Sequence, residues 1–183
     1  MRRVPVVAFL GATEFASFHV DVIVGIRMTG EPDDGRPLVA VEPLGLKSAH
    51  YRIYPLADHV ADKIVAFLER HPDAASTGQG STRYRDLADL AVIAHREVID
   101  AADLRVALTS EITRRGLSLP AALPTPTTGS WRAGYARVAR DVPDLPERDL
   151  DSALVTVRAF VDPVLQGVAC GVWDPKRMEW RRS

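Results

Sequence analysis

The period of the hydrophobic pattern changes at Pro55, and this change limits the folds open to the chain more than any other feature. Before it, residues 4–10 and 15–24 are β-branched or alternate between apolar and polar residues, as strands do. After it, apolar residues follow helical spacing, beginning with Leu56, Val60, Ile64, Phe67 and Leu68. We therefore predict an α+β protein with a β-rich lobe over residues 1–55 and a helical lobe over residues 56–183.

The first lobe is predicted to contain a hairpin that turns around residues 11–13. Glycines and prolines in residues 29–37 predict a stretch without regular structure, and short strands are expected over 38–42 and 51–54.

Five helices are predicted in the second lobe. The helices are predicted from Leu56 to about His71, from about Thr82, over 102–115, over 130–140 and over 147–161. A polar loop is predicted over 73–81 and a connector over 120–128. Asp58 is expected to cap the first helix, and Asp162-Pro163 to end the last. Aromatic residues are expected in the core, namely Trp131, Tyr135, Trp173 and Trp180, and the thiol of Cys170 is expected to be buried.

Composition excludes several classes of protein. The chain has 183 residues, 46% of them hydrophobic, and a formal net charge of −1, which excludes a disordered chain and a strongly basic nucleic-acid-binding protein. A single cysteine excludes a disulfide scaffold, and no apolar run approaches the ~18 residues that span a bilayer. The short apolar run after Met1 lacks a signal-peptide cleavage site, so we expect a cytoplasmic protein with no membrane partner.

Two single residues are candidates for chemistry. Asp21 lies in the middle of a predicted strand, where aspartate is rare; it either faces solvent beside His19 or serves as a metal-binding carboxylate. Lys63 is one of only three lysines among 23 cationic residues and lies at the edge of the apolar helical stripe. Its stem either covers apolar surface while the ammonium reaches water, or the ammonium binds a phosphate.

The segment from Ser81 to Leu90 allows a structural and a functional interpretation. Ser81 or Thr82 can cap a helix whose first turns contain Asp86, with Arg83 and Asp86 as an i,i+3 ion pair. The same segment places Arg83, Arg85 and backbone N–H groups together at a helix start, which is also how anion sites are built.

Two of these segments together resemble a known family. Residues 54–66, which contain Ala61-Asp62-Lys63-Ile64, and residues 82–90, which contain Arg83-Tyr84-Arg85-Asp86, resemble the AbiEii-type nucleotidyltransferase toxins, including the mycobacterial MenT group. Residues 18–25, 131–135 and 161–175 are also similar to that family, so the resemblance covers nearly the whole chain.

The resemblance implies a polymerase-β-like nucleotidyltransferase sheet followed by a helical lobe, in the toxin of a toxin–antitoxin pair. Such a protein transfers a nucleoside monophosphate from an NTP to an RNA 3′ hydroxyl, with tRNA as acceptor in the MenT group, Mg²⁺ as cofactor and a cognate antitoxin as partner. By the same resemblance Asp21, Lys63 and Asp86 are the catalytic residues, and Lys63, Arg83 and Arg85 bind the nucleotide. Lys63 holds nucleotide phosphates, and Asp86 belongs to an arginine–aspartate motif flanked by the two arginines. Asp21 is the third carboxylate of the sheet, which supports a metal or takes a proton from the attacking hydroxyl.

The chain departs from the family pattern in one respect. The family carries a Gly-Ser turn followed by an Asp-x-Asp pair before the lysine helix, and residues 1–62 contain no such pair. Two expectations follow: the start codon lies upstream and the sheet lobe is truncated, or the chain is an inactive member that binds an antitoxin or RNA. An unrelated RNA-binding domain is a third reading, which the near-neutral charge disfavours.

Overall fold

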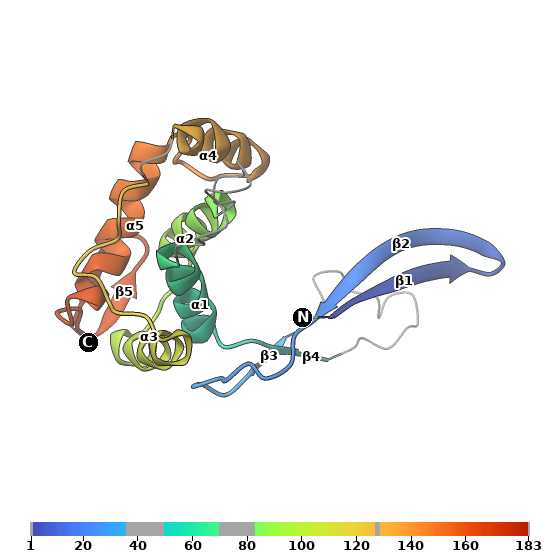
Figure 1. Ribbon diagram of the computed structural model, residues 1–183, viewed down its shortest axis with the longest axis horizontal. Helices are drawn as coiled ribbons and strands as arrows, with labels where there is room; N and C mark the ends of the chain where they lie inside the picture. The colour runs from blue at the N-terminus through green and yellow to red at the C-terminus, as the bar shows by residue number, and fades with distance from the viewer. Residues whose placement is uncertain (1, 36–49, 70–82, 127–128, 183) are drawn as a thin grey trace.

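The structure is a computed structural model that describes residues 2–35, 50–69, 83–126 and 129–182. Within these residues, five helices form one packed body, and three two-stranded antiparallel sheets lie around or beside it (Figure 1). The elements are β1 (Arg2–Leu10), β2 (Thr13–Val22), β3 (Asp33–Gly35), β4 (Tyr51–Ile53), α1 (Leu56–Leu68), α2 (Tyr84–Arg96), α3 (Ala101–Arg115), α4 (Ser130–Asp141), α5 (Leu150–Leu165), β5 (Val172–Asp174) and β6 (Glu179–Arg181). None of the described helices is long and apolar enough to cross a membrane.

The predicted N-terminal hairpin is confirmed. β1 and β2 pair in antiparallel register from Arg2 opposite Val22 to Leu10 opposite Thr13. Gly11 turns the chain with a φ of 64°, a conformation that glycine adopts without strain. The hairpin extends away from the helices in Figure 1, and among the described strands β1 and β2 pair only with each other.

The turn-rich stretch before Pro37 contains a strand, so the prediction of no regular structure there was wrong. β3 pairs with β4, and Gly35 lies opposite Tyr51. A Cβ atom on Gly35 would lie 2.2 Å from Cδ1 of Ile53, so glycine here permits the two chains to approach closely. The short strand predicted over 51–54 is confirmed as β4, whereas the segments at 38–42 and 73–81 lie outside the described residues.

The helical body is built around α1 and α2. α1 packs chiefly on α3, and α2 packs on α1, α4 and α5. Their facing side chains are almost completely buried, including Val60, Ile64, Leu87, Leu90, Leu104, Tyr135, Val157 and Phe160. The helical periodicity therefore predicted both the helices and their buried faces.

Asp58 does not cap α1, contrary to the prediction. The N-cap position is Pro55, and the buried Asp58 carboxylate accepts hydrogen bonds from the backbone N–H groups of Thr29 and Gly30 at 3.0 Å and from the Thr29 hydroxyl at 2.9 Å. These bonds satisfy a carboxylate that burial would otherwise destabilise. They also tie the chain segment after β2 to the start of α1.

Pro163 lies inside α5 rather than ending it, so this prediction was also wrong. Proline removes one hydrogen bond near the helix end, whereas Val164 and Leu165 remain buried beyond it. The C-terminal β5–β6 hairpin was not predicted. Its Trp173 is fully buried, and the Trp173 indole donates a hydrogen bond to the carbonyl oxygen of Ala94 at 2.7 Å.

The expected aromatic core is confirmed, with Trp131, Tyr135 and Trp173 buried and Trp180 partly buried against Trp173. Cys170, however, is exposed rather than buried.

Candidate functional site

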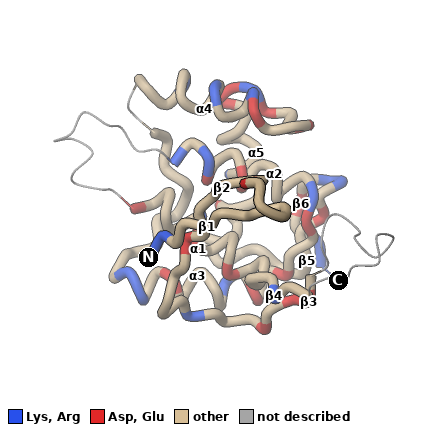
Figure 2. The backbone as a smooth tube through the Cα atoms, turned by 90° about the vertical axis from the view of Figure 1, so that its right-hand side faces the viewer, with Lys and Arg blue, Asp and Glu red and all other residues tan. Residues whose placement is uncertain are grey.

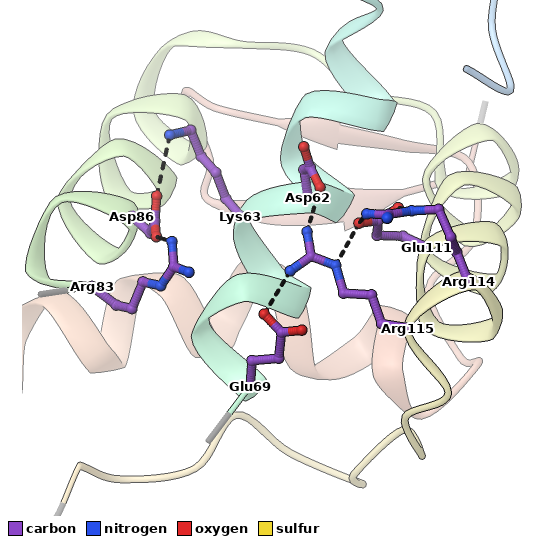
Figure 3. Close-up of polar contacts among 8 residues, drawn as sticks. All are labelled: Asp62, Lys63, Glu69, Arg83, Asp86, Glu111, Arg114 and Arg115. Carbon is purple, nitrogen blue, oxygen red and sulfur yellow. Dashed lines mark hydrogen bonds and ion pairs between the residues drawn. The ribbon is translucent and has the colours of Figure 1, made fainter. Parts of the chain in front are cut away.

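Three of the five predicted site residues meet where α1 and α2 face each other (Figure 3). The Lys63 ammonium lies 3.6 Å from one oxygen of the Asp86 carboxylate, and Nη1 of Arg83 lies 3.3 Å from the other oxygen. Lys63 also donates a hydrogen bond of 2.5 Å to Asp89. The predicted i,i+3 pair between Arg83 and Asp86 is thereby confirmed.

The local sequence explains this arrangement. α2 begins at Tyr84, with Arg83 at the N-cap position and no side-chain cap. Ser81 and Thr82, which were predicted to begin and cap this helix, lie outside the described residues. Asp86 lies in the first turn, where the helix dipole favours a carboxylate. Lys63 projects from the edge of the buried face of α1, and its side chain is only 16% exposed. Its ammonium is thus held by carboxylates at the helix interface.

A cavity of about 360 Å³ opens beside these residues. Its lining residues come from the segment after β2, from the end of β4 and from α1, α2 and α3: Ile23, Ile26, Tyr54, His59, Asp62, Lys63, Ala66, Arg83, Asp86 and Arg115. The lining therefore combines apolar and aromatic side chains with cations and carboxylates. Lys63 and Arg83 bring two positive charges to it.

Two ring-bearing residues of the cavity are uncharged at neutral pH. Partial desolvation, together with the positive charge of Lys63, lowers the pKa of His59 below its ordinary value. Partial burial and the nearby carboxylates of Asp62 and Asp58 raise the pKa of Tyr54 to about 12. Tyr54 and His59 therefore present neutral polar rings to the cavity.

Arg115 is a feature of the cavity that the sequence analysis missed. Its guanidinium contacts Asp62 at 2.7 Å, Glu69 at 2.7 Å and Glu111 at 2.6 Å, joining the end of α3 to α1 (Figure 3). The sequence showed Arg114 and Arg115 only as cations at a helix end, a pattern that the helix dipole explains by itself. Three carboxylates surround one guanidinium, so Arg115 contributes no unbalanced positive charge to the cavity.

The pKa values of two of these carboxyl groups move in opposite directions. Hydrogen bonds from Arg114, followed by those from Asp62 and Arg115, lower the pKa of Glu111 to about 2, although burial opposes the shift. Burial and the neighbouring Glu111 raise the pKa of Asp62.

The structure does not bring Asp21 and Arg85 to the cavity lining. Asp21 is exposed on β2, and Nε and Nη2 of Arg3 bind its two oxygens at 2.8 Å and 3.0 Å. These hydrogen bonds lower the pKa of Asp21. Ile23, two residues further along, does line the cavity, so Asp21 lies about 7 Å along the chain from its edge. Arg85 is exposed on α2.

These residues do not fit a Mg²⁺ ion. Arg3 occupies both oxygens of Asp21, and Lys63 and Arg83 occupy those of Asp86. Mg²⁺ sites are built on carboxylates free to ligate the ion. Across residues 2–35, 50–69, 83–126 and 129–182, no group of three or more His, Cys, Asp or Glu side chains is arranged to hold a metal.

Comparison with known proteins assigns the family. A family model described as the nucleotidyl transferase AbiEii toxin of a type IV toxin–antitoxin system matches residues 3–157. No curated protein and no solved structure matches the chain. The matched span includes the β1–β2 hairpin, the lysine helix α1 and the arginine–aspartate start of α2. Because the match covers most of the 183 residues, the chain belongs to the AbiEii nucleotidyl transferase toxin family.

Proposed function

We propose that this chain binds a nucleoside triphosphate in the cavity between α1 and α2 and transfers its nucleoside monophosphate to the 3′ hydroxyl of an RNA, with tRNA as the acceptor. The convergence of Lys63 and Arg83 on one side of that cavity is the observation that supports it most directly. Both are charge-assisted hydrogen-bond donors for phosphate oxygens. The volume of about 360 Å³ falls within the range of ligand pockets, roughly 300–1,000 Å³.

In the free protein, Asp86 contacts both cations, and Asp89 contacts Lys63 as well. A triphosphate carries more negative charge than these two carboxylates together, so it competes with them for Lys63 and Arg83. Asp86 then acts as a positioning residue that keeps the two side chains directed at the phosphates. Arg85 would add positive charge from the exposed surface of α2.

The proposed reaction forms a bond between the RNA 3′ oxygen and the α-phosphorus, and pyrophosphate leaves. Lys63 and Arg83 would stabilise the negative charge that grows on the departing phosphates. The proton of the attacking hydroxyl must pass to a base, and Asp21 is the proposed acceptor. Its pairing with Arg3 lowers its basicity, so Asp21 can serve efficiently only when Arg3 moves away.

The alternative function is a binding module without catalysis, which uses the helical lobe to engage RNA or the cognate antitoxin. Two observations favour it: residues 1–62 contain no Asp-x-Asp pair, and cations occupy both predicted carboxylates. In this case the cavity would bind a nucleotide or an RNA phosphate without transferring it.

One experiment separates the two functions. The purified chain is incubated with each α-labelled NTP, Mg²⁺ and total tRNA, and labelled RNA is resolved on a gel. The proposal predicts labelled tRNA that is lost in Lys63→Ala and in Asp21→Asn and only partly reduced in Arg85→Ala, because Arg85 lies outside the cavity lining. Nucleotide binding without any labelled RNA would identify the binding module instead. Label transfer that is unchanged in Lys63→Ala would exclude the cavity as the active site.

A further inference from the structure

The buried carboxylate of Asp58 takes no part in the proposed reaction, yet it binds a neighbouring chain segment closely. Asp58 lies in the first turn of α1 and is only 5% exposed. One oxygen accepts hydrogen bonds from the Thr29 N–H at 3.0 Å and the Thr29 hydroxyl at 2.9 Å, and the other accepts from the Gly30 N–H at 3.0 Å. Hydrogen bonds to an ionised acceptor are among the strong ones in proteins. Asp58 therefore fixes Thr29 and Gly30 on α1.

The backbone at Gly30 also packs directly against the start of α1. A Cβ atom on Gly30 would lie 3.2 Å from Cβ of Pro55 and 3.7 Å from Oδ2 of Asp58. The first distance is shorter than an ordinary van der Waals contact between carbon atoms. Steric contact thus adds to the hydrogen bonds, and this end of the segment is held in place.

Residues 23–30, which we call the strap, join β2 to this anchor. Residues 23–28 form neither helix nor strand, so no ladder of backbone hydrogen bonds fixes their course. Ile23 and Ile26 of the strap line the cavity. A chain spans at most about 3.6 Å per residue, so Ile26 lies within about 11 Å of Thr29. Fixing Thr29 therefore restricts where the Ile26 side chain can lie.

The anchor and the cavity share one helix. His59, Asp62 and Lys63 of α1 line the cavity, and Asp62 follows Asp58 by four residues, which places it one turn further along the same face. At its other end the strap continues into β2, whose hairpin extends away from the helices in Figure 1 and projects toward the viewer in Figure 2. Asp58, rather than the hairpin, thus sets the position of the strap beside the cavity.

We propose that Asp58 is a positioning residue for nucleotide binding: it holds the strap so that Ile23 and Ile26 contact the nucleoside part of a bound NTP. This inference rests on the proposed function, in which Lys63 and Arg83 bind the phosphates. In the free protein Ile23 is 54% exposed and Ile26 43%. Their exposed apolar surface gains from contact with a base or ribose, as the apolar lining of a ligand site does.

Asp58 acts on binding and not on the chemical step, because its carboxylate is taken up by Thr29 and Gly30. We expect Asp58→Asn, whose amide nitrogen cannot accept a hydrogen bond, to raise the NTP dissociation constant about fivefold. In the transferase assay KM for the NTP rises similarly, and kcat stays within about twofold. The matched control Asp162→Asn alters a carboxylate on α5 that accepts a bond of 2.8 Å from the Leu123 N–H, outside the cavity lining, so NTP binding is unchanged.

A double-mutant cycle separates this positioning role from a general loss of stability. Isothermal titration compares Asp58→Asn in the wild type and in an Ile23→Ala/Ile26→Ala background, with each of the four NTPs. If Asp58 acts through the strap, the substitution costs about fivefold in the wild type and less than about twofold in the background that lacks both isoleucines. Thr29→Val, which removes only the hydroxyl bond, replaces Asp58→Asn in the cycle if that variant loses its helical circular dichroism.

Hydrogen exchange without nucleotide tests the anchor itself. The amides of Thr29 and Gly30 should exchange at least about tenfold faster in Asp58→Asn, while those of α5 do not change. Equal NTP affinity of the wild type and Asp58→Asn, equal losses in the two backgrounds, or equal exchange of the strap overturns the proposal. A wild type that binds no NTP overturns the proposed function and this inference with it, whereas failure of the inference alone leaves NTP binding that still depends on Lys63.

Discussion

The ammonium of Lys63 on α1 faces the carboxylate of Asp86 on α2 across 3.6 Å. These residues are far apart in the sequence, and the helix packing between α1 and α2 brings them together. Arg83 binds the same carboxylate, so one acidic side chain orients two cations beside the cavity.

Lys63→Ala is expected to weaken NTP binding at least about tenfold, because it removes a charge-assisted hydrogen bond to phosphate worth roughly 1.5–3 kcal/mol. Isothermal titration with each of the four NTPs measures the effect. Lys63→Arg should recover only part of the affinity, since a planar guanidinium cannot replace a compact ammonium held by Asp86 and Asp89. Equal affinity in the wild type and Lys63→Ala would contradict the proposed phosphate site.

Arg115→Ala is expected to lower the free energy of unfolding by about 2 kcal/mol, because it leaves three neighbouring carboxylates without their common cation. Urea denaturation at neutral pH provides the measurement. Arg114→Ala is the matched control: its side chain is 46% exposed and its guanidinium pairs with Glu111, so the expected loss is below about 1 kcal/mol. Equal losses in the two variants would show that Arg115 does not organise this interface.

Local patterns predicted the elements much better than they predicted the contacts between them. The alternation in β1 and β2 and the helical stripes identified the hairpin and the five helices, because each depends on residues close in sequence. The cluster around Arg115 was missed since its partners Asp62 and Glu69 are far along the chain. Pro163 was misassigned because local propensity does not include the packing of Val164 beyond it.

The pKa of Glu111 predicts an acid-sensitive contribution to stability. Its folded-state pKa of about 2 is below the ordinary 4.5, so its ionised form stabilises the fold above about pH 4.5. This stabilisation is lost progressively as the pH falls from 4.5 towards 2. Urea denaturation between these pH values should therefore show a smaller acid-induced loss in Glu111→Gln than in the wild type.

Asp62 supplies a control of opposite sign for this pH dependence. Its raised pKa means that protonation favours the folded state, which offsets part of the loss caused by Glu111. The acid-induced loss in Asp62→Asn should consequently be steeper than in the wild type. The same acid dependence in all three proteins would show that neither carboxyl group is linked to folding.

Gly134 on α4 allows the helix to lie directly against the Tyr84 ring of α2. A Cβ atom at this position would lie 2.4 Å from Cζ of Tyr84, and that ring is held edge-on to Trp131 with centroids 4.8 Å apart. Gly134→Ala should therefore lower the free energy of unfolding, because a clash of about 1–3 kcal/mol outweighs the gain in helix propensity of roughly 1 kcal/mol. Thermal or urea denaturation measures the difference.

The sign of this effect should reverse when the ring is removed. In a Tyr84→Ala background the clash disappears, so Gly134→Ala gains only the helix propensity and stabilises the protein by up to about 1 kcal/mol. Gly129→Ala, where no atom lies within 4 Å of the added Cβ, is the control for a glycine without a steric role. Destabilisation by Gly134→Ala in both backgrounds would mean that Tyr84 is not what requires glycine at this position.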